Sequence, residues 1–392
     1  MQTRRGLTYK PADIQDNGIR VLRSSNINGD VFAYGDEDVF VNPNAINIEF
    51  VKRNDILITS ANGSSRLVGK HAIIKEILDD SAVHGGFMLL GRTKNYNFIN
   101  ASMSSSWYTR FINVFVAGGN GAIGNLNKND LDEQIILVPS DKEQRQIGNF
   151  FSNLDNLITL HQRKYEKLVN VKKFMLEKMF PKNGEKSPEI RFSEFTDDWE
   201  QRKLSELATM HARIGWQNLR TSEFLDSGDY MLITGTDFED GKVNYSTCHY
   251  VEKERYEQDK NIQIKNGNIL ITKDGTLGKV AYVENLNMPA TLNAGVFNVE
   301  VKDKNETDGK YLFQFLKAPF LMDYVAQKAT GGTIKHLNQN ILVNFSISIP
   351  SKAEQIRIGE YFSNLDNLIT LHQRKLEKLQ NIKKSMLDKM FI

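Results

Sequence analysis

The residues with the most chemistry to offer lie in polar, glycine-containing loops. TSANGSSRLVGKH (59–71) and TKDGTLGK (272–279) each begin at the end of an apolar run, DILIT or NILIT. Arginine, lysine, amide and hydroxyl side chains are the groups that hydrogen-bond phosphate oxygens and base edges. Contact with a nucleic acid is therefore the first chemistry to consider for these loops.

Similar loops occur at matching places in both halves of the chain. VLRSSN (21–26), GGNGAIGNLNK (118–128) and TGGTIKHLNQ (330–339) use the same residue types. Each loop taken singly is also typical of an ordinary polar surface turn. Their recurrence favours the interpretation as DNA contacts, and the candidate contact residues are Arg23, Asn26, Ser64, Arg66, Lys70, Lys273, Thr276, Lys279, Thr333, Lys335 and His336.

Other chemistry fits these residues poorly. A P-loop requires GxxxxGK followed by Ser or Thr, but five residues separate Gly63 from Gly69, and His71 stands at the hydroxyl position. The seven histidines form no HxxxH or HExxH pair, and Cys248 is the only cysteine. We therefore expect no metal site and no intrachain disulfide. No GxSxG or Rossmann fingerprint occurs, so we expect no catalytic residue either.

The composition is that of an ordinary globular protein. Of the 392 residues, 40% are hydrophobic and 25% are charged. No apolar run approaches the roughly 18 residues of a membrane span, and MQTRRGLTYK does not resemble a signal peptide. These features predict a cytoplasmic protein without a membrane association.

Charge is balanced in the loop-bearing parts. Residues 1–140 carry 14 basic and 14 acidic side chains, and residues 181–350 carry 20 and 24. A protein that binds DNA unaided usually has a basic excess, because phosphate neutralisation supplies most non-specific affinity. If these parts contact DNA, we expect them to do so through local patches and with the help of a partner.

The elements that must position the loops show an internal repeat. FSNLDNLITLHQRK occurs at 151–164 and again, unchanged, 211 residues later at 362–375. At the same offset PSDKEQRQIGNF matches PSKAEQIRIGEY, and YEKLVNVKKFMLEKMF matches LEKLQNIKKSMLDKMF. The chain is therefore a tandem of two units, each a variable globular part followed by a nearly invariant helical part.

Both helical parts have the pattern of a long coiled-coil helix. Each begins with a capping box, Ser140 with Glu143 and Ser351 with Glu354. Apolar residues then alternate at spacings of four and three, and the same register continues to Lys172 and Lys383. The predicted seam residues are Phe151, Leu154, Ile158, His161, Tyr165 and Leu168, and Phe362, Leu365, Ile369, His372, Leu376 and Leu379.

An antiparallel pair within the chain would bring the two histidines together. With the midpoints aligned, His161 meets His372, and the layers on either side are apolar. Those layers pair Leu154 with Leu379, Leu168 with Leu365, Phe151 with Ile382 and Met175 with Ile358. The histidines are interpreted as a polar layer that fixes the register, with a pH switch as the alternative.

The variable parts contain short β-type runs separated by Gly, Asn and Asp, with a helical stretch at 311–329. The predicted fold is α+β, with two recognition domains separated by two long antiparallel helices and related by an internal pseudo-two-fold repeat. The predicted boundaries are 1–138 for domain 1, 139–180 for helix 1, 181–199 for a linker, 200–349 for domain 2 and 350–392 for helix 2.

The chain resembles the specificity subunits of type I restriction-modification systems. The resemblance rests on two variable domains that are each followed by the motif PSxxEQxxIGxxFSNLDNLITLHQRKxEKLxNxKKxMLxKMF. This resemblance implies that each domain recognises half of a bipartite target in double-stranded DNA, while the coiled coil sets the spacer. It also implies two methyltransferase subunits and restriction/translocase subunits as partners. S-adenosylmethionine, ATP and magnesium would bind those partners, and this chain would bind no cofactor.

One segment departs from a perfect repeat. Residues 188–208 open the second unit and resemble the segment that opens a recognition domain in this family, but the first unit starts almost at GLTYK (6–10). We expect domain 1 either to be truncated or to lack this opening element. Two alternative functions are a coiled-coil assembly scaffold that binds protein and not DNA, and an enzyme whose catalytic site no motif reveals.

Overall fold

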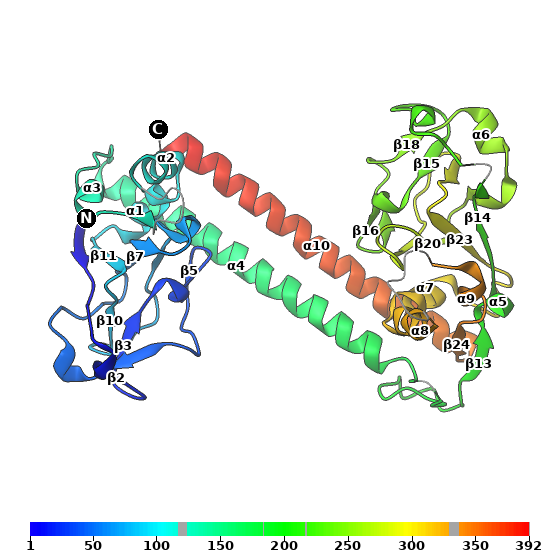
Figure 1. The fold of residues 1–392 in the computed structure, drawn as a ribbon, viewed down its shortest axis with the longest axis horizontal. Helices are drawn as coiled ribbons and strands as arrows, with labels where there is room; N and C mark the ends of the chain where they lie inside the picture. Colours follow the sequence, from blue (N-terminus) through cyan, green and yellow to red (C-terminus); the bar gives the residue numbers. More distant parts are fainter. Residues whose placement is uncertain (117–123, 183, 216–217, 329–336, 392) are drawn as a thin grey trace. The chain divides into compact units, whose positions relative to one another are not determined.

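The computed structural model describes residues 1–116, 124–182, 184–215, 218–328 and 337–391. The chain forms two compact units, which are described separately below. Unit 1 comprises residues Met1–Arg163 and His372–Ile392, and unit 2 comprises residues Lys164–Leu371. Figure 1 shows a mixed β structure with short helices in each unit, together with segments of the long helices α4 (Asp141–Lys178) and α10 (Lys352–Met390). The α+β prediction is confirmed.

Unit 1 contains two four-stranded sheets. The first is antiparallel, in the order β1 (Gln2–Arg5), β11 (Met88–Arg92), β7 (Ile56–Thr59) and β9 (His71–Ile73). The second has the order β10 (Ala82–His84), β3 (Ile19–Leu22), β6 (Val39–Val41) and β2 (Ile14–Gln15), with β10 parallel to β3. All four side chains of β7 are buried, and its first three residues, Ile56, Leu57 and Ile58, form an apolar run rather than an alternating pattern.

Three short helices complete the globular part of unit 1. They are α1 (Tyr96–Met103), α2 (Ser106–Phe115) and α3 (Lys128–Asp132). Phe98 and Phe111 from these helices share one apolar core with Ile56 and Ile58 of β7. The helices therefore cover one face of the first sheet and hold it against the long helices.

Unit 2 repeats this plan with a larger sheet. Its six strands have the order β14 (Ala208–Ala212), β23 (Val296–Val301), β20 (Ile269–Thr272), β21 (Val280–Tyr282), β17 (Lys242–Val243) and β16 (Phe238–Glu239). The second sheet has the order β18 (His249–Tyr250), β15 (Met231–Ile233), β22 (Ala290–Leu292) and β19 (Gln263–Ile264). Helices α7 (Gly309–Lys317), α8 (Phe320–Lys328) and α9 (Gln339–Leu342) correspond to α1, α2 and α3.

Unit 2 also contains a pair of strands with no counterpart among the described residues of unit 1. β13 (Glu200–Lys203) pairs antiparallel with β24 (Ser346–Ile349), and α5 (Leu204–Leu207) links β13 to β14. These elements come from the segment 188–208, which the sequence assigned to the opening of the second domain.

The two long helices pair antiparallel inside each unit. In unit 1 the Nδ1 atoms of His161 and His372 are 2.8 Å apart, and the rings of Phe151 and Phe391 lie 5.9 Å apart. In unit 2 the rings of Phe180 and Phe362 stack at 5.8 Å. Phe362 and Phe180 are the repeat counterparts of Phe151 and Phe391, so the contact recurs with the sequence. The predicted pairing of the histidines and the internal repeat are both confirmed.

The seam residues are less exposed than their neighbours, as the heptad pattern predicts. The buried seam residues are Phe151, Leu154, Phe362 and Leu365. The other predicted seam residues of both helices are partly exposed. Leu168 packs in the same core as Leu365. Phe151 also contacts Phe391, which lies just beyond the end of α10 and was not among the predicted layers. The layer of Phe151 with Ile382 stays a prediction.

Two ion-pair layers lie in the seam where the sequence predicted apolar contacts. Lys172 pairs with Asp366 in unit 2, and its repeat counterpart Lys383 pairs with Asp155 at 2.8 Å in unit 1. A buried ammonium is stable only when a carboxylate compensates its charge, and the helix repeat supplies that carboxylate at matching positions. The expectation that only the histidine layer is polar is therefore wrong.

The two layers differ in charge. Lys383 also contacts Asp30 at 3.0 Å, and these two carboxylates raise the pKa of Lys383 despite the opposing effect of burial. Lys172 has one carboxylate nearby, and burial together with the charge of Lys317 lowers its pKa. The same helix sequence thus sits in a net acidic environment in unit 1 and a more basic one in unit 2.

Candidate nucleic-acid interface

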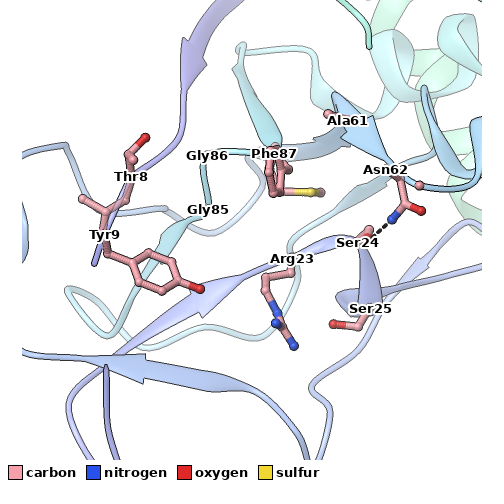
Figure 2. Close-up of a pocket in the computed structure, with 13 residues that line it drawn as sticks. Thr8, Tyr9, Arg23, Ser24, Ser25, Ala61, Asn62, Gly85, Gly86 and Phe87 are labelled. Atoms are coloured by element: carbon pink, nitrogen blue, oxygen red, sulfur yellow. Dashed lines mark hydrogen bonds between the residues drawn. The ribbon is translucent and has the colours of Figure 1, made fainter. Parts of the chain in front are cut away.

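A cleft of about 630 Å³ opens at one end of the two sheets of unit 1. Figure 2 shows Tyr9 at the left of the view, Arg23 and Ser25 below its centre, and Phe87 above them. The cleft is lined by Leu7, Thr8, Tyr9, Arg23, Ser24, Ser25, Ala61, Asn62, Gly63, Gly85, Gly86, Phe87 and Met88. It combines a guanidinium, hydroxyls, an amide and an aromatic ring, which are groups able to contact phosphates, base edges and base faces.

A turn after β3 places Arg23 at the rim. The turn is the 3-10 helix η2 (Ser24–Asn26), and Asn26 stabilises it by accepting a hydrogen bond from the Arg23 amide at 2.8 Å. The side-chain amide of Asn26 also donates to Ala33 O at 3.1 Å and to Asp38 Oδ1 at 2.7 Å. Asn26 is fully buried, so its observed role is to hold the turn. Arg23 is partly exposed, and its guanidinium donates to Glu37 O at 3.4 Å.

The loop between β7 and β9 carries Ser64, Arg66 and Lys70 on its exposed side. Its ends are closed by backbone hydrogen bonds from Thr59 to Lys70 at 2.8 Å and from Gly69 to Thr59 at 2.9 Å. From behind, the Tyr108 hydroxyl donates to Gly69 O at 3.0 Å. Gly69 has a φ of 84°, a conformation that a residue with a side chain rarely adopts.

The corresponding loop of unit 2 follows β20 and carries Lys273, Thr276 and Lys279. Thr272 closes this loop, because its hydroxyl donates to Thr276 O at 2.5 Å and accepts from the Lys279 amide at 2.9 Å. The Lys273 ammonium lies 5.6 Å from the centre of the Phe297 ring. Thr276 and Lys279 are exposed, and Lys273 is partly exposed.

Backbone hydrogen bonds show which residues of the two loops are equivalent. Ser60 donates to Phe87 O at 2.9 Å, just as Lys273 donates to Gly295 O at 2.9 Å. Thr272 likewise donates to Lys279 O at 2.9 Å, which makes Lys279 the counterpart of Lys70. The backbone frame is thus shared, and a lysine follows the loop in both units.

The exposed side chains on this frame differ between the units. Arg23 and Thr234 occupy equivalent places, since the backbone amide of each donates to the side-chain oxygen of the residue three positions later, Asn26 in one case and Asp237 in the other. Phe87, which is 70% exposed, corresponds to a glycine in unit 2. Two edges with one backbone geometry and different side chains are suited to contacting two different nucleotide sequences.

Two buried histidines lie behind the interface of unit 1. His71 Nδ1 is 3.0 Å from Asn100 Oδ1, and burial lowers the pKa of His71. Burial likewise lowers the pKa of His84 to about 4, with His84 Nε2 3.3 Å from Arg4 O. Both rings are therefore neutral near pH 7, and the positive charge of the interface comes from its arginine and lysine side chains.

Most of the candidate contact residues that the structure describes lie on the surface. Arg23, Ser64, Arg66 and Lys70 lie in unit 1, whereas Lys273, Thr276 and Lys279 lie in unit 2. Asn26 is the buried exception. The remaining candidates, Thr333, Lys335 and His336, lie outside the described residues.

Sequence reasoning missed Tyr9, Asn62 and Phe87 as members of the cleft. The Asn62 side-chain amide donates to Ser24 Oγ at 3.0 Å and so joins the β7–β9 loop to the η2 turn. One signal was available for Phe87, because an aromatic residue directly after Gly85 and Gly86 at the end of a strand favours an exposed turn. Tyr9 and Asn62 carried no comparable signal.

Two other kinds of site find no support in the described part of the chain. No three His, Cys, Asp or Glu side chains there gather closely enough to hold a metal ion. None of the described helices is long and apolar enough to cross a membrane.

Comparison with known proteins gives consistent matches along the whole chain. A family model described as "Type I restriction modification DNA specificity domain" matches residues 4–170 and again residues 196–381. The MjaVIII specificity subunit of Methanocaldococcus jannaschii is 25% identical, over 68% of this chain and 63% of its own length. The StySPI specificity subunit of Salmonella potsdam is 22% identical, over 99% of this chain and 85% of its own length.

A solved structure shows the same fold. The S subunit of a type I restriction-modification system from M. genitalium superposes with a TM-score of 0.65 at 16% identity, over 100% of this chain and 93% of that one. The chain spans less than two thirds of the length of the MjaVIII relative.

Proposed function

Since the chain belongs to the family of type I restriction modification DNA specificity proteins, we propose that it is the specificity subunit of such a system. Each unit recognises one half of a bipartite target in double-stranded DNA. The chain supplies recognition and not catalysis. Methylation and cleavage are then carried out by its partner subunits.

The observation that carries this proposal is the pair of structurally equivalent loops, 59–71 in unit 1 and 272–279 in unit 2. Both units hold an exposed loop on the same hydrogen-bond frame, ending in Lys70 in one case and Lys279 in the other. The side chains before these lysines differ in type and number. A shared frame positions each edge against the DNA backbone, while the different side chains select different bases.

The long helices support the expected partners, which are two methyltransferase subunits together with restriction/translocase subunits. Leu157 and Leu160 of α4 are each 46% exposed, and their repeat counterparts Leu368 and Leu371 of α10 are 44% and 45% exposed. Identical apolar side chains exposed on both helices are suited to two copies of one partner. S-adenosylmethionine, ATP and magnesium are proposed to bind those partners.

Methylation mapping tests the proposed function. The chain is produced with its methyltransferase subunits in a host without other adenine methylation, and methyladenine is mapped across the genome. We expect one asymmetric bipartite motif with a fixed spacer, and none when the chain is omitted. Methylation of the same sites without the chain would contradict the proposal.

Two further measurements separate the alternatives. A scaffold that binds only protein would assemble with the methyltransferase but would not retard the target DNA in a gel shift. An enzyme would methylate DNA by itself, whereas we expect no methylation by the chain alone.

The helices are also proposed to set the spacer between the two half-sites. Seven residues inserted into each helix at equivalent repeat positions would lengthen the seam by about 10 Å, at 1.5 Å per residue. The mapped motif should then gain about three base pairs of spacer, at roughly 3.4 Å per base pair. An unchanged spacer would contradict this part of the proposal.

A further inference from the structure

Phe87 is an exposed aromatic residue inside the proposed DNA interface. It lines the cleft of unit 1, and 70% of its side chain is exposed to solvent (Figure 2). Aromatic side chains usually contribute most of their surface to a core or to an interface. Because so little of this ring is buried within unit 1, most of its surface is available to a ligand in the cleft.

The backbone of Phe87 is fixed to the candidate recognition loop of unit 1. Its carbonyl oxygen accepts hydrogen bonds from the amides of Ser60 at 2.9 Å and of Ala61 at 3.1 Å. Both amides belong to the start of the loop 59–71, which also carries Lys70. The ring therefore keeps its position relative to the loop, and any DNA that the loop contacts meets the ring in a defined place.

Two glycines pack the turn before Phe87 against the rest of unit 1. A Cβ atom added at Gly85 would lie 3.2 Å from Val21 Cγ1, and one added at Gly86 would lie 3.3 Å from Leu7 O. Side chains at these positions would have to displace their neighbours. The turn is thus held on both sides, which further restricts the position of the ring.

Unit 2 has the same turn without an aromatic ring. Gly295 O accepts a hydrogen bond from the Lys273 amide at 2.9 Å, which corresponds to the bond from Ser60 to Phe87. The φ angle of Gly295 is not positive, and a Cβ atom there would lie 3.6 Å from Asp274, an ordinary contact distance. The frame therefore tolerates a side chain in both units, so the backbone does not require the difference between them.

The chemistry of the ring selects one kind of base edge. A phenyl ring has no hydrogen-bonding group, so the part of a base that complements it in a groove is apolar. In the major groove thymine presents a methyl group, with the O4 acceptor beside it, and the other three bases present no methyl group. Arg23 lines the same cleft and carries guanidinium N–H donors that suit such an acceptor.

We propose that Phe87 recognises a thymine in the half-site of unit 1 through contact between its ring and the 5-methyl group of the base. Arg23 supplies a donor for an acceptor near that methyl group. Unit 2 makes no such contact, because Gly295 has no side chain at this place. This assignment rests on the proposed function, since it requires unit 1 to face base edges in the major groove.

Replacement of thymine by uracil tests the contact, because uracil differs from thymine only in lacking the methyl group. The chain is assembled with its methyltransferase subunits, and each thymine on either strand of the target is replaced singly by deoxyuridine. At one position in one half-site we expect binding to weaken about fivefold, the effect of withdrawing roughly one methyl group from contact. With Phe87→Ala the thymine and uracil targets should bind equally at that position.

Two further variants separate this contact from a change in folding. Phe87→Leu keeps an apolar side chain and should retain a preference for thymine of about twofold or more. Leu78→Ala is the matched control, because Leu78 is another exposed apolar residue of unit 1, and it should leave the preference of about fivefold unchanged. Hydrogen exchange of unit 1 should be the same with Phe87→Ala as with the unchanged chain, since an exposed side chain contributes little to stability.

The proposal is overturned if no thymine in the target shows a methyl effect that depends on Phe87. It is also overturned if 2-aminopurine, scanned through the target, reports unstacking that Phe87→Ala abolishes while uracil replacement has no effect, since the ring would then insert between bases. Failure of the proposed function gives a different result. The assembled complex would then fail to retard the target DNA with thymine or with uracil, and both proposals would fall.

Discussion

Units 1 and 2 have one backbone frame and different side chains on it. The hydrogen bonds that close the loop after β7 recur after β20, and the same aromatic contact closes each helix pair. Yet Arg23 is replaced by Thr234, and Phe87 by Gly295. The interior differs too, because the strand pairings place Leu292 where unit 1 has His84.

This difference separates two requirements. Groups that position the loops must keep their geometry, because a shift of the frame would move every contact residue at once. Side chains at the exposed edge are under no such restriction and can change one at a time. A duplicated frame can therefore carry two different recognition surfaces, and each unit can be perturbed separately.

The largest expected effect comes from the aromatic pairs at the helix ends. Phe362→Ala removes a ring stacked on Phe180 and should lower the free energy of unfolding of unit 2 by about 3–5 kcal/mol. Phe151→Ala should cost unit 1 a similar amount. Urea titration with hydrogen exchange resolved by unit measures both effects. The control Phe174→Ala removes a half-exposed ring of α4 and should cost less than about 0.5 kcal/mol.

The ion-pair layers sharpen the comparison of the units. Asp366→Asn leaves the buried Lys172 without its carboxylate and should cost about 3 kcal/mol in unit 2. Asp155→Asn should cost roughly 1 kcal/mol in unit 1, because Lys383 keeps Asp30. Chemical denaturation of both variants tests this order. Adding Lys172→Met to Asp366→Asn should restore most of the loss, since it removes the uncompensated charge.

Acid should destabilise unit 1 before unit 2. The folded-state pKa of His84 is about 4, below the ordinary value near 6.5, so between these values the unfolded state binds a proton that the folded state does not. Stability is therefore complete above pH 6.5 and falls as the pH drops toward 4, by roughly 1–2 kcal/mol at pH 5. His71, whose pKa is also lowered by burial, acts in the same direction.

Hydrogen exchange at pH 5 and pH 7 measures this effect in each unit. The variant His84→Leu introduces the residue that unit 2 has at this place and should remove most of the acid sensitivity of unit 1. Equal sensitivity of unit 2 would contradict the assignment to these histidines.

The smallest expected effects are at the loop lysines, and they test recognition directly. In the assembled complex Lys70→Ala should weaken DNA binding about three- to tenfold through one half-site only, and targets substituted in each half-site in turn show which one. Lys279→Ala should weaken binding by a similar factor through the other half-site. The exposed Lys253 of α6 (Lys253–Glu257) provides a control, because Lys253→Ala should leave the binding of both half-sites unchanged. An equal loss at both half-sites for either loop variant would indicate general electrostatic attraction instead.

The repeated helices were predictable because their signals are local. The caps at Ser140 and Ser351 and the spacing of Phe151, Leu154 and Ile158 depend only on neighbours along the chain. The identity of the two copies then led to the pairing of His161 with His372. The contacts at the helix ends were not predictable in this way, since Phe391 lies beyond the heptad pattern and reaches Phe151 only through the packed core.

The candidate site was predictable in part. Loops after DILIT and NILIT are exposed because a buried strand must be followed by a surface turn, and this argument located Arg66, Lys70 and Lys279 correctly on the surface. It could not separate Arg23 from Asn26, which share one turn but differ in burial. The roles of all the candidate residues in DNA contact stay predictions, including those of Thr333, Lys335 and His336.

The sequence by itself determined the repeat, the two long helices with their histidine layer, and the family that the chain resembles, because periodicity and identity are properties of the linear chain. Only the tertiary structure decided which carboxylates pair with Lys172 and Lys383, and that Tyr9, Asn62 and Phe87 form a cleft with Arg23. Those features join residues far apart in the sequence, and their contacts depend on how strands and helices pack in three dimensions.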